Sequence, residues 1–171
     1  MSKKWLTIFI GFVLALMLAS CDLDADGAHH EIGEATAIEE LEDIEYFRPG
    51  ALAHILEGEL NEKGQAVGFH YDRLPTKKGE IVSGTETKPN EYGVYEAKVM
   101  VSDVEKKSNR GKSTFFPDEW DTQDVVDAIN EAYEYKVHLT GNVFEGLAAD
   151  GLVIRMYLDE QDKIISAFPI Y

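Results

Sequence analysis

The sequence predicts an α+β fold, in which short helices come first and mostly antiparallel strands follow. Residues 94–102 alternate between apolar and polar side chains, the pattern of a strand with one buried face. Residues 121–135 instead repeat apolar side chains at helical spacing. Because the regular strand–helix–strand alternation of parallel sheets is missing, these elements indicate the α+β class.

The helix expected over about 121–135 has a defined start. Asp121 and Asp124 have the spacing of a capping box, in which each side chain accepts a hydrogen bond from the backbone N–H of the other residue. The apolar positions form one stripe that should face the core: Val125, Val126, Ile129, Ala132 and Tyr133.

The strand over 94–104 is the clearest of the predicted strands. One face should carry Tyr95, Ala97, Val99 and Val101, and the other Val94, Glu96, Lys98, Met100 and Ser102. A short helix is expected within 51–56 and a strand over 65–71, with Val67, Phe69 and Tyr71 on one side and His70 on the other. Three further strands are expected within 136–144, 151–159 and 163–171, the last two joined by a turn at 159–162.

The N-terminus has the features of a secretory signal. Lys3 and Lys4 precede an apolar run, which small residues end just before Cys21. The run is shorter than the ~20 residues that a membrane-spanning helix needs. "LASC" resembles the bacterial lipobox, which implies a signal peptide over 1–20 and a lipid on Cys21. The alternative is an ordinary signal peptide that leaves Cys21 as a free thiol exposed to oxidation.

Residues 21–48 are acidic and poor in strand formers, and we expect them to form a tether with a short helix within 35–47. His29 and His30 lie in this segment and are interpreted as solvated residues rather than metal ligands. From Pro49 onward the sequence has the apolar periodicity and turn residues of a folded domain, so the predicted folded domain covers 49–171.

The net charge of −16 argues against non-specific binding to nucleic acid, and DNA is not expected as a partner. The charge is uneven, however. Residues 67–115 carry nine Lys and Arg against seven Asp and Glu. A small basic cleft in an acidic body suits an anion held at one place, although a solvated loop rich in lysine gives the same count.

Two histidines and a lysine are sufficient for phosphodiester transfer within RNA. One imidazole removes the proton of the ribose 2′-OH and the other protonates the leaving 5′ oxygen. A fixed ammonium stabilises the charge on the phosphorane oxygens. His54, His70 and Lys98 are the candidates, and this chemistry requires no metal or cofactor. His138 is assigned to structure, and Lys98 alone would be read as an ordinary surface lysine.

Four segments together resemble the bacterial EndoU nuclease family: "HILEGELNEKGQAVGFHY", "GVYEAKVMV", "STFFP" and "IISAFPIY". The resemblance covers about residues 50–171 and implies an EndoU-like fold. It also implies RNA cleavage that is metal-independent or variable in its metal requirement, often 3′ of uridine, with a 2′,3′-cyclic phosphate product. The catalytic histidines of the family fall on His54 and His70, and its lysine on Lys98, with Lys112 as the alternative.

The resemblance also indicates residues that would bind the substrate base. Relatives often carry a hydroxyl residue, any residue, then Tyr and Pro near the end of the domain, where this chain has Ser166, Ala167, Phe168 and Pro169. Phe168 keeps a ring for stacking but lacks the phenol oxygen, which leaves the base preference open. The missing hydroxyl could come from any of four residues: Ser113, Thr114, Tyr157 or Tyr171.

The prediction is therefore an EndoU-type endoribonuclease for single-stranded RNA, held outside the cytoplasm of a bacterium by a lipid on Cys21. Bacterial members of the family are commonly toxin domains, for which an immunity protein is a candidate partner. The rival interpretation is a lipoprotein with an EndoU-like fold that binds RNA or a surface partner without cleaving it.

Overall fold

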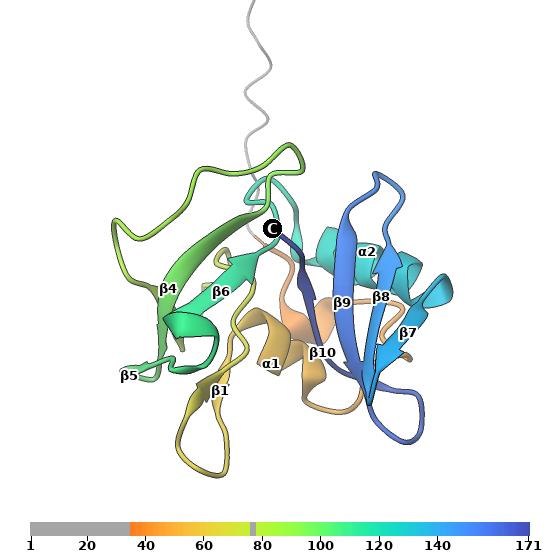
Figure 1. Ribbon diagram of the computed structural model, residues 1–171, viewed down its shortest axis with the longest axis horizontal. Helices are drawn as coiled ribbons and strands as arrows, with labels where there is room; N and C mark the ends of the chain where they lie inside the picture. Colours follow the sequence, from red (N-terminus) through yellow and green to blue (C-terminus); the bar gives the residue numbers. More distant parts are fainter. Residues whose placement is uncertain (1–34, 76–77) are drawn as a thin grey trace, which may run out of the picture. The chain divides into compact units, whose positions relative to one another are not determined.

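The computed structural model describes residues 35–75 and 78–171, and Figure 1 shows how their elements are arranged. The helical elements are η1 (Ile38–Glu40), α1 (Ala51–Leu56), η2 (Ser108–Gly111) and α2 (Thr122–Glu134). The strands are β1 (Glu59–Leu60), β2 (Ala66–Val67), β3 (Gly79–Ile81), β4 (Tyr95–Val101), β5 (Val104–Glu105), β6 (Lys112–Phe115), β7 (Val137–Thr140), β8 (Val143–Leu147), β9 (Val153–Leu158) and β10 (Ile164–Pro169). The α+β class is confirmed.

The strands form two four-stranded antiparallel sheets and one small hairpin. The C-terminal sheet has the order β10-β9-β8-β7. In the other sheet β3 and β5 pair with β4 along one stretch, and β6 pairs with β4 along another. β1 and β2 pair as a hairpin. Figure 1 shows the two sheets side by side, with β10 as the edge of the C-terminal sheet that is nearer to the other sheet and with α1 beside β10.

α2 covers one face of the C-terminal sheet. The capping box between Asp121 and Asp124 is present, and the predicted apolar stripe is buried. The helix packs so closely on β8 that a Cβ atom on Gly146 would lie 1.8 Å from the carbonyl oxygen of Ala132. Burying each large apolar side chain of the stripe stabilises the fold by about 1.5–3 kcal/mol.

The buried side chains form two hydrophobic cores, one for each sheet. The larger core joins α1, α2 and the C-terminal sheet. The smaller core belongs to the β4 sheet. The chain crosses from one core to the other around His70, since Phe69 packs in the smaller core and Tyr71 in the larger. His70 therefore lies where the two hydrophobic cores meet.

Residues 35–48 differ from the predicted tether. Ala35, Leu41 and Phe47 are buried, and Phe47 forms a parallel bridge with Ile164 of β10. Thr36 also bonds through its backbone N–H and its hydroxyl to the carboxylate of Asp121. The helix expected within 35–47 is only the three-residue 3₁₀ turn η1. The folded part thus begins before Pro49, because three well-spaced apolar side chains hold this acidic segment to the core.

The strand predicted over 65–71 is also shorter than expected. β2 ends at Val67, because Gly68 and Phe69 both adopt left-handed backbone angles, with φ of 73° and 62°. His70 is buried rather than set on an exposed face. In β4 the predicted buried face is confirmed, but Val94, which was placed on the other face, is buried in the larger core.

Within the described residues, no helix is both long enough and apolar enough to span a membrane. Cys21, His29 and His30 lie outside the described residues, and so do the predicted signal peptide and the first half of the predicted tether.

Candidate active site

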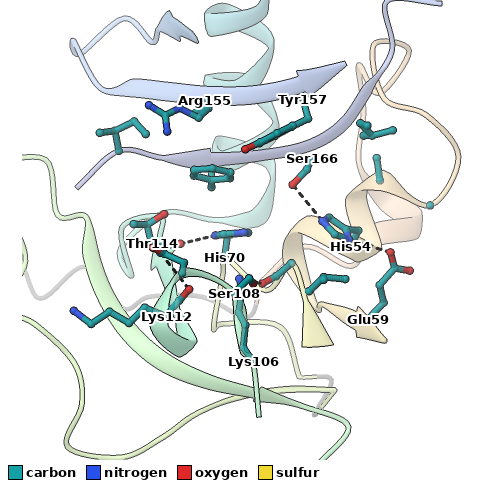
Figure 2. A pocket seen from close by; sticks show the side chains of 18 of the residues that line it. His54, Glu59, His70, Lys106, Ser108, Lys112, Thr114, Arg155, Tyr157 and Ser166 are labelled. Atoms are coloured by element: carbon teal, nitrogen blue, oxygen red, sulfur yellow. Dashed lines mark hydrogen bonds and ion pairs between the residues drawn. The ribbon is translucent and has the colours of Figure 1, made fainter. Parts of the chain in front are cut away.

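A cleft of about 930 Å³ lies between the two sheets. Residues of α1, η2, β6, β9 and β10 line it, together with the segment that leads into His70. Figure 2 shows that His54, His70 and Lys106 lie around the same space, although they come from three different parts of the chain. A cleft of this size falls within the usual range for small-molecule and cofactor sites.

His54 lies on α1 at the rim of the cleft. Leu52, Ile55 and Leu56 bury the other side of the helix, which leaves the imidazole facing the cleft. Its Nδ1 atom is 3.0 Å from Oε1 of Glu59, and its Nε2 atom is 3.2 Å from Oγ of Ser166. The imidazole is 17% exposed and the Glu59 side chain 57% exposed. His54 is therefore a rim residue with a carboxylate beside it.

His70 occupies a different environment, deeper in the cleft, where only 6% of the residue is exposed. Its Nδ1 atom donates to the carbonyl oxygen of Thr114 at 2.7 Å. A carbonyl can only accept, so the proton is on Nδ1, and Nε2 keeps a free lone pair in the neutral ring. Burial, and then the positive charge of Lys106, hold the pKa of His70 well below 6.5.

The turn at Gly68 and Phe69 connects the two histidines directly. The N–H of Phe69 donates to the carbonyl oxygen of His54 at 3.1 Å, and the N–H of His70 donates to that of Ile55 at 2.7 Å. A Cβ atom on Gly68 would lie 1.9 Å from the His54 oxygen, so only glycine fits. The C-terminal end of α1 is thereby fixed against the segment that carries His70.

Lys106 completes the group around the cleft. Its Nζ atom donates to the carbonyl oxygen of Gly68 at 3.1 Å and to Oγ of Ser113 at 2.8 Å. Burial lowers the pKa of Lys106 to about 8. The side chain therefore remains mostly an ammonium at neutral pH, and it is held by the same glycine that positions the histidines.

Lys98, the lysine predicted from the sequence, does not line the cleft. It pairs with Lys112 across β4 and β6, so both lysines belong to the same face of the sheet. Lys112 does line the cleft and forms an ion pair with Glu96 at 2.9 Å, but Lys98 lies farther along β4 and is exposed. The structure thus places Lys98 on the same strand face as Lys112 but outside the lining of the cleft.

Most of the residues predicted to contact the substrate base do line the cleft: Thr114, Tyr157, Ser166, Phe168 and Tyr171. The Phe168 ring stacks on the His70 imidazole, with ring centroids 5.0 Å apart and an interplanar angle of 17°. Tyr157 lies beside Phe168, at 6.1 Å between centroids. Ser113 is buried behind the cleft, where it holds Lys106 and Gly68.

Other features lie away from the cleft. The Nε2 atom of His138 is 3.0 Å from the carbonyl oxygen of Gly141, and its ring packs beside Phe144. A carbonyl accepts, so the Nε2 atom is the donor, and this contact agrees with the structural role expected for His138. Within the described residues, no group of three or more His, Cys, Asp or Glu side chains is placed to hold a metal ion.

Sequence reasoning missed several residues of the cleft. Lys106 lies in the segment "EKKSNRGK", whose basic character was visible but gave no reason to prefer one lysine. Glu59 follows His54 by five residues, beyond the end of α1, so helical spacing could not pair them. Arg48 and Arg155 are two further cations that line the cleft.

Comparisons with known proteins agree with this geometry. Residues 50–171 match the profile of the family described as Bacterial EndoU nuclease. A Bacillus cereus protein named "Toxin" is 48% identical to the chain over 132 residues. The alignment covers 77% of this chain but 24% of that protein, so the chain spans about a quarter of the relative's length. No solved structure matches the chain.

Proposed function

The chain belongs to the bacterial EndoU nuclease family, and we propose that it cleaves single-stranded RNA by transesterification at the ribose 2′-OH. The products would be a 2′,3′-cyclic phosphate and a free 5′-OH. The observation that carries this proposal is the difference between the two imidazoles that line one cleft beside an ammonium. Each of the three groups is suited to a different part of the reaction.

His70 is the general base in this proposal. Its proton is held on Nδ1 by the Thr114 carbonyl, so Nε2 can accept the proton of the 2′-OH. The lowered pKa supports this role, because the ring stays neutral at neutral pH. Phe168 stacks on the imidazole and limits its rotation.

His54 is the general acid, which protonates the 5′ oxygen as the bond to phosphorus breaks. A carboxylate beside the ring favours this role, because it stabilises the positive charge that the imidazole carries before it gives up its proton. Glu59 occupies this position, 3.0 Å from Nδ1. It is a positioning residue, since it lies on the far side of the ring from Nε2.

Lys106 supplies the charge that stabilises the phosphorane. Its contacts with Gly68 and Ser113 hold the ammonium in place before the substrate arrives, so little reorganisation is needed in the transition state. We assign this role to Lys106 in place of Lys98, because Lys106 lines the cleft and is partly desolvated.

We further propose that uridine is the preferred base on the 5′ side of the cleaved bond. Phe168 and Tyr157 offer aromatic rings, and base–aromatic stacking is worth roughly 1–3 kcal/mol per base. Ser166 is engaged with His54 and the Thr114 hydroxyl is buried, so Tyr157 is better placed to give the hydroxyl that Phe168 lacks.

The proposed setting is outside the cytoplasm, with a lipid on Cys21 tethering the domain to a bacterial membrane. This separates the nuclease from the RNA of the cell that makes it. The name of the Bacillus cereus relative supports a role as a toxin, for which an immunity protein would be a partner. These features rest on the N-terminal sequence and on the relative's name.

The test is incubation of the purified protein with a uridine-containing oligoribonucleotide, followed by identification of the 3′ end of the product. We expect a 2′,3′-cyclic phosphate with or without a chelator. His54→Ala and His70→Ala should each lower kcat/KM by about 10²–10⁴-fold, the usual contribution of a general acid or base.

His138→Ala is the matched control, because it removes a histidine outside the cleft and should leave cleavage within about twofold. Equal activity of wild type and both cleft variants would overturn the enzyme assignment. RNA binding without any cleavage by the wild-type protein would favour the binding module instead.

A further inference from the structure

The cleft contains three cations that the proposed reaction does not use, and one of them has no side-chain partner among the described residues. Four Lys and Arg side chains line the cleft in the described part of the chain: Arg48, Lys106, Lys112 and Arg155. Lys106 is bonded to Gly68 and Ser113, and the other two form ion pairs with Glu96 and Glu145. Among the described residues, the Arg48 guanidinium alone of the four has no hydrogen bond or ion pair, and it remains available to a ligand.

The backbone of Arg48 is fixed in place although its side chain is exposed. Its N–H donates to the carbonyl oxygen of Ile164 at 2.9 Å, and its own carbonyl accepts from the N–H of Ala51, also at 2.9 Å. Arg48 is thus attached to the start of β10 and to the start of α1. These two elements carry Ser166 and His54, whose side chains are in contact.

Arg48 therefore belongs to the His54 side of the cleft, whereas Lys106 contacts Gly68 and acts electrostatically on His70. The inference that follows rests on the proposed function, in which His54 protonates the leaving 5′ oxygen. The leaving nucleoside must then lie on the His54 side. If the RNA continues, the next phosphate in the 3′ direction follows on that same side.

We propose that Arg48 binds the phosphate 3′ to the leaving nucleoside. A guanidinium presents a planar pair of N–H donors that matches two phosphate oxygens, and its charge is permanent at physiological pH. The volume of the cleft, about 930 Å³, leaves room for more than the scissile linkage. The substrate class is accordingly an RNA strand that continues for at least one phosphate past the cleaved bond.

The experiment compares two minimal substrates, UpA and the same dinucleotide with a 3′-terminal phosphate, UpAp. For the wild-type protein at low salt, the extra phosphate should raise kcat/KM about tenfold, the scale of one hydrogen-bonded contact with a charged group. In Arg48→Gln this ratio should fall to near one, and in Arg48→Lys it should be intermediate because the two-point contact is lost.

Arg110→Gln is the matched control, because Arg110 is an exposed arginine outside the cleft lining. It should keep the wild-type ratio of UpAp to UpA. If the ratio of UpAp to UpA falls equally in Arg48→Gln and Arg110→Gln, the 3′ phosphate responds only to the overall positive charge around the cleft. That result would overturn the subsite. A wild-type ratio near one, or an unchanged ratio in Arg48→Gln, would overturn it as well.

Binding of 2′-deoxy analogues separates this inference from the proposed function, because these analogues cannot be cleaved at the missing 2′-OH. A 3′ phosphate should tighten their binding to wild type and not to Arg48→Gln, measured by calorimetry. If wild type cleaves neither ribonucleotide, the proposed function fails. In that case, loss of the phosphate-dependent binding in Arg48→Gln would still support the subsite, and its persistence would overturn it.

Discussion

The two imidazoles of the cleft, those of His54 and His70, differ in their exposure to solvent and in the groups that surround them. His54 is at the rim, on a helix, with the largely exposed Glu59 carboxylate beside it. His70 is in the inner wall, buried between the two cores, with a backbone carbonyl, an aromatic ring and Lys106 around it. In the proposed mechanism this difference separates the two roles, because the buried environment suits a neutral ring and the carboxylate at the rim suits a ring that carries a proton.

The inner wall should be the more sensitive of the two regions, and Lys106 is the residue that tests this most strongly. Lys106→Gln keeps a hydrogen-bonding side chain but removes the charge, and kcat/KM should fall by about 10²–10³-fold. The matched control is Lys98→Gln, which removes an exposed lysine and should stay within about twofold. A larger loss in Lys98→Gln than in Lys106→Gln would return the catalytic role to Lys98.

The pH dependence separates the inner wall from the rim with a smaller effect. The ammonium of Lys106 is lost as the pH rises through about 8, since burial lowers its pKa to that value. The ratio of kcat/KM between wild type and Lys106→Gln should therefore be constant up to about pH 7 and fall by about tenfold at pH 9. The comparison is made between pH 7 and pH 9, above the range in which His70 titrates in the wild type, because removing Lys106 also removes a charge that lowers the pKa of His70.

The acid side of the same profile reports on His70. The base must be neutral, and its pKa lies well below 6.5, so wild-type activity should persist below pH 6.5. For the Lys106 test above, a ratio of wild type to Lys106→Gln that stays constant up to pH 10 would show that the charge of Lys106 does not contribute to the rate-limiting step. An acid limb at or above pH 6.5 would contradict the buried, neutral state of His70.

Glu59→Gln is the smallest change and tests the rim. Glutamine can still contact Nδ1 of His54 but brings no charge, and exposed charge pairs contribute little, so we expect a loss of about fivefold in kcat with KM nearly unchanged. An effect on KM alone would mean that Glu59 contacts the substrate rather than the acid.

The parts of the fold that depend on local pattern could be predicted from the sequence. The capping box at Asp121 and the stripe behind it determine α2, and strict alternation determines β4. The turn at 159–162 joins β9 to β10 as expected, with Asp159 bonded back to the N–H of Lys163. His54 and His70, which line one cleft, were both named from the sequence because their segments resemble those of the family.

The parts that depend on contacts distant in sequence could not be predicted. Nothing in the residue type of Phe69 indicates a left-handed backbone, which is set by hydrogen bonds to the end of α1. Residues 35–48 look like a tether because their few apolar side chains follow no period, yet Phe47 pairs with β10. Lys106 could not be told from Lys98, because the choice depends on how the β4 sheet meets the other sheet.

Gly68 has a consequence for experiments that search for active residues by substitution. The position has no side chain, yet its carbonyl holds Lys106, and its lack of a Cβ atom allows the close approach to His54. A scan that replaces each residue with alanine would rank Gly68 alongside His54, His70 and Lys106. One methyl group at this position would change the spacing of His54, His70 and Lys106 together. Activity data alone would not distinguish this loss of geometry from the loss of a reacting group.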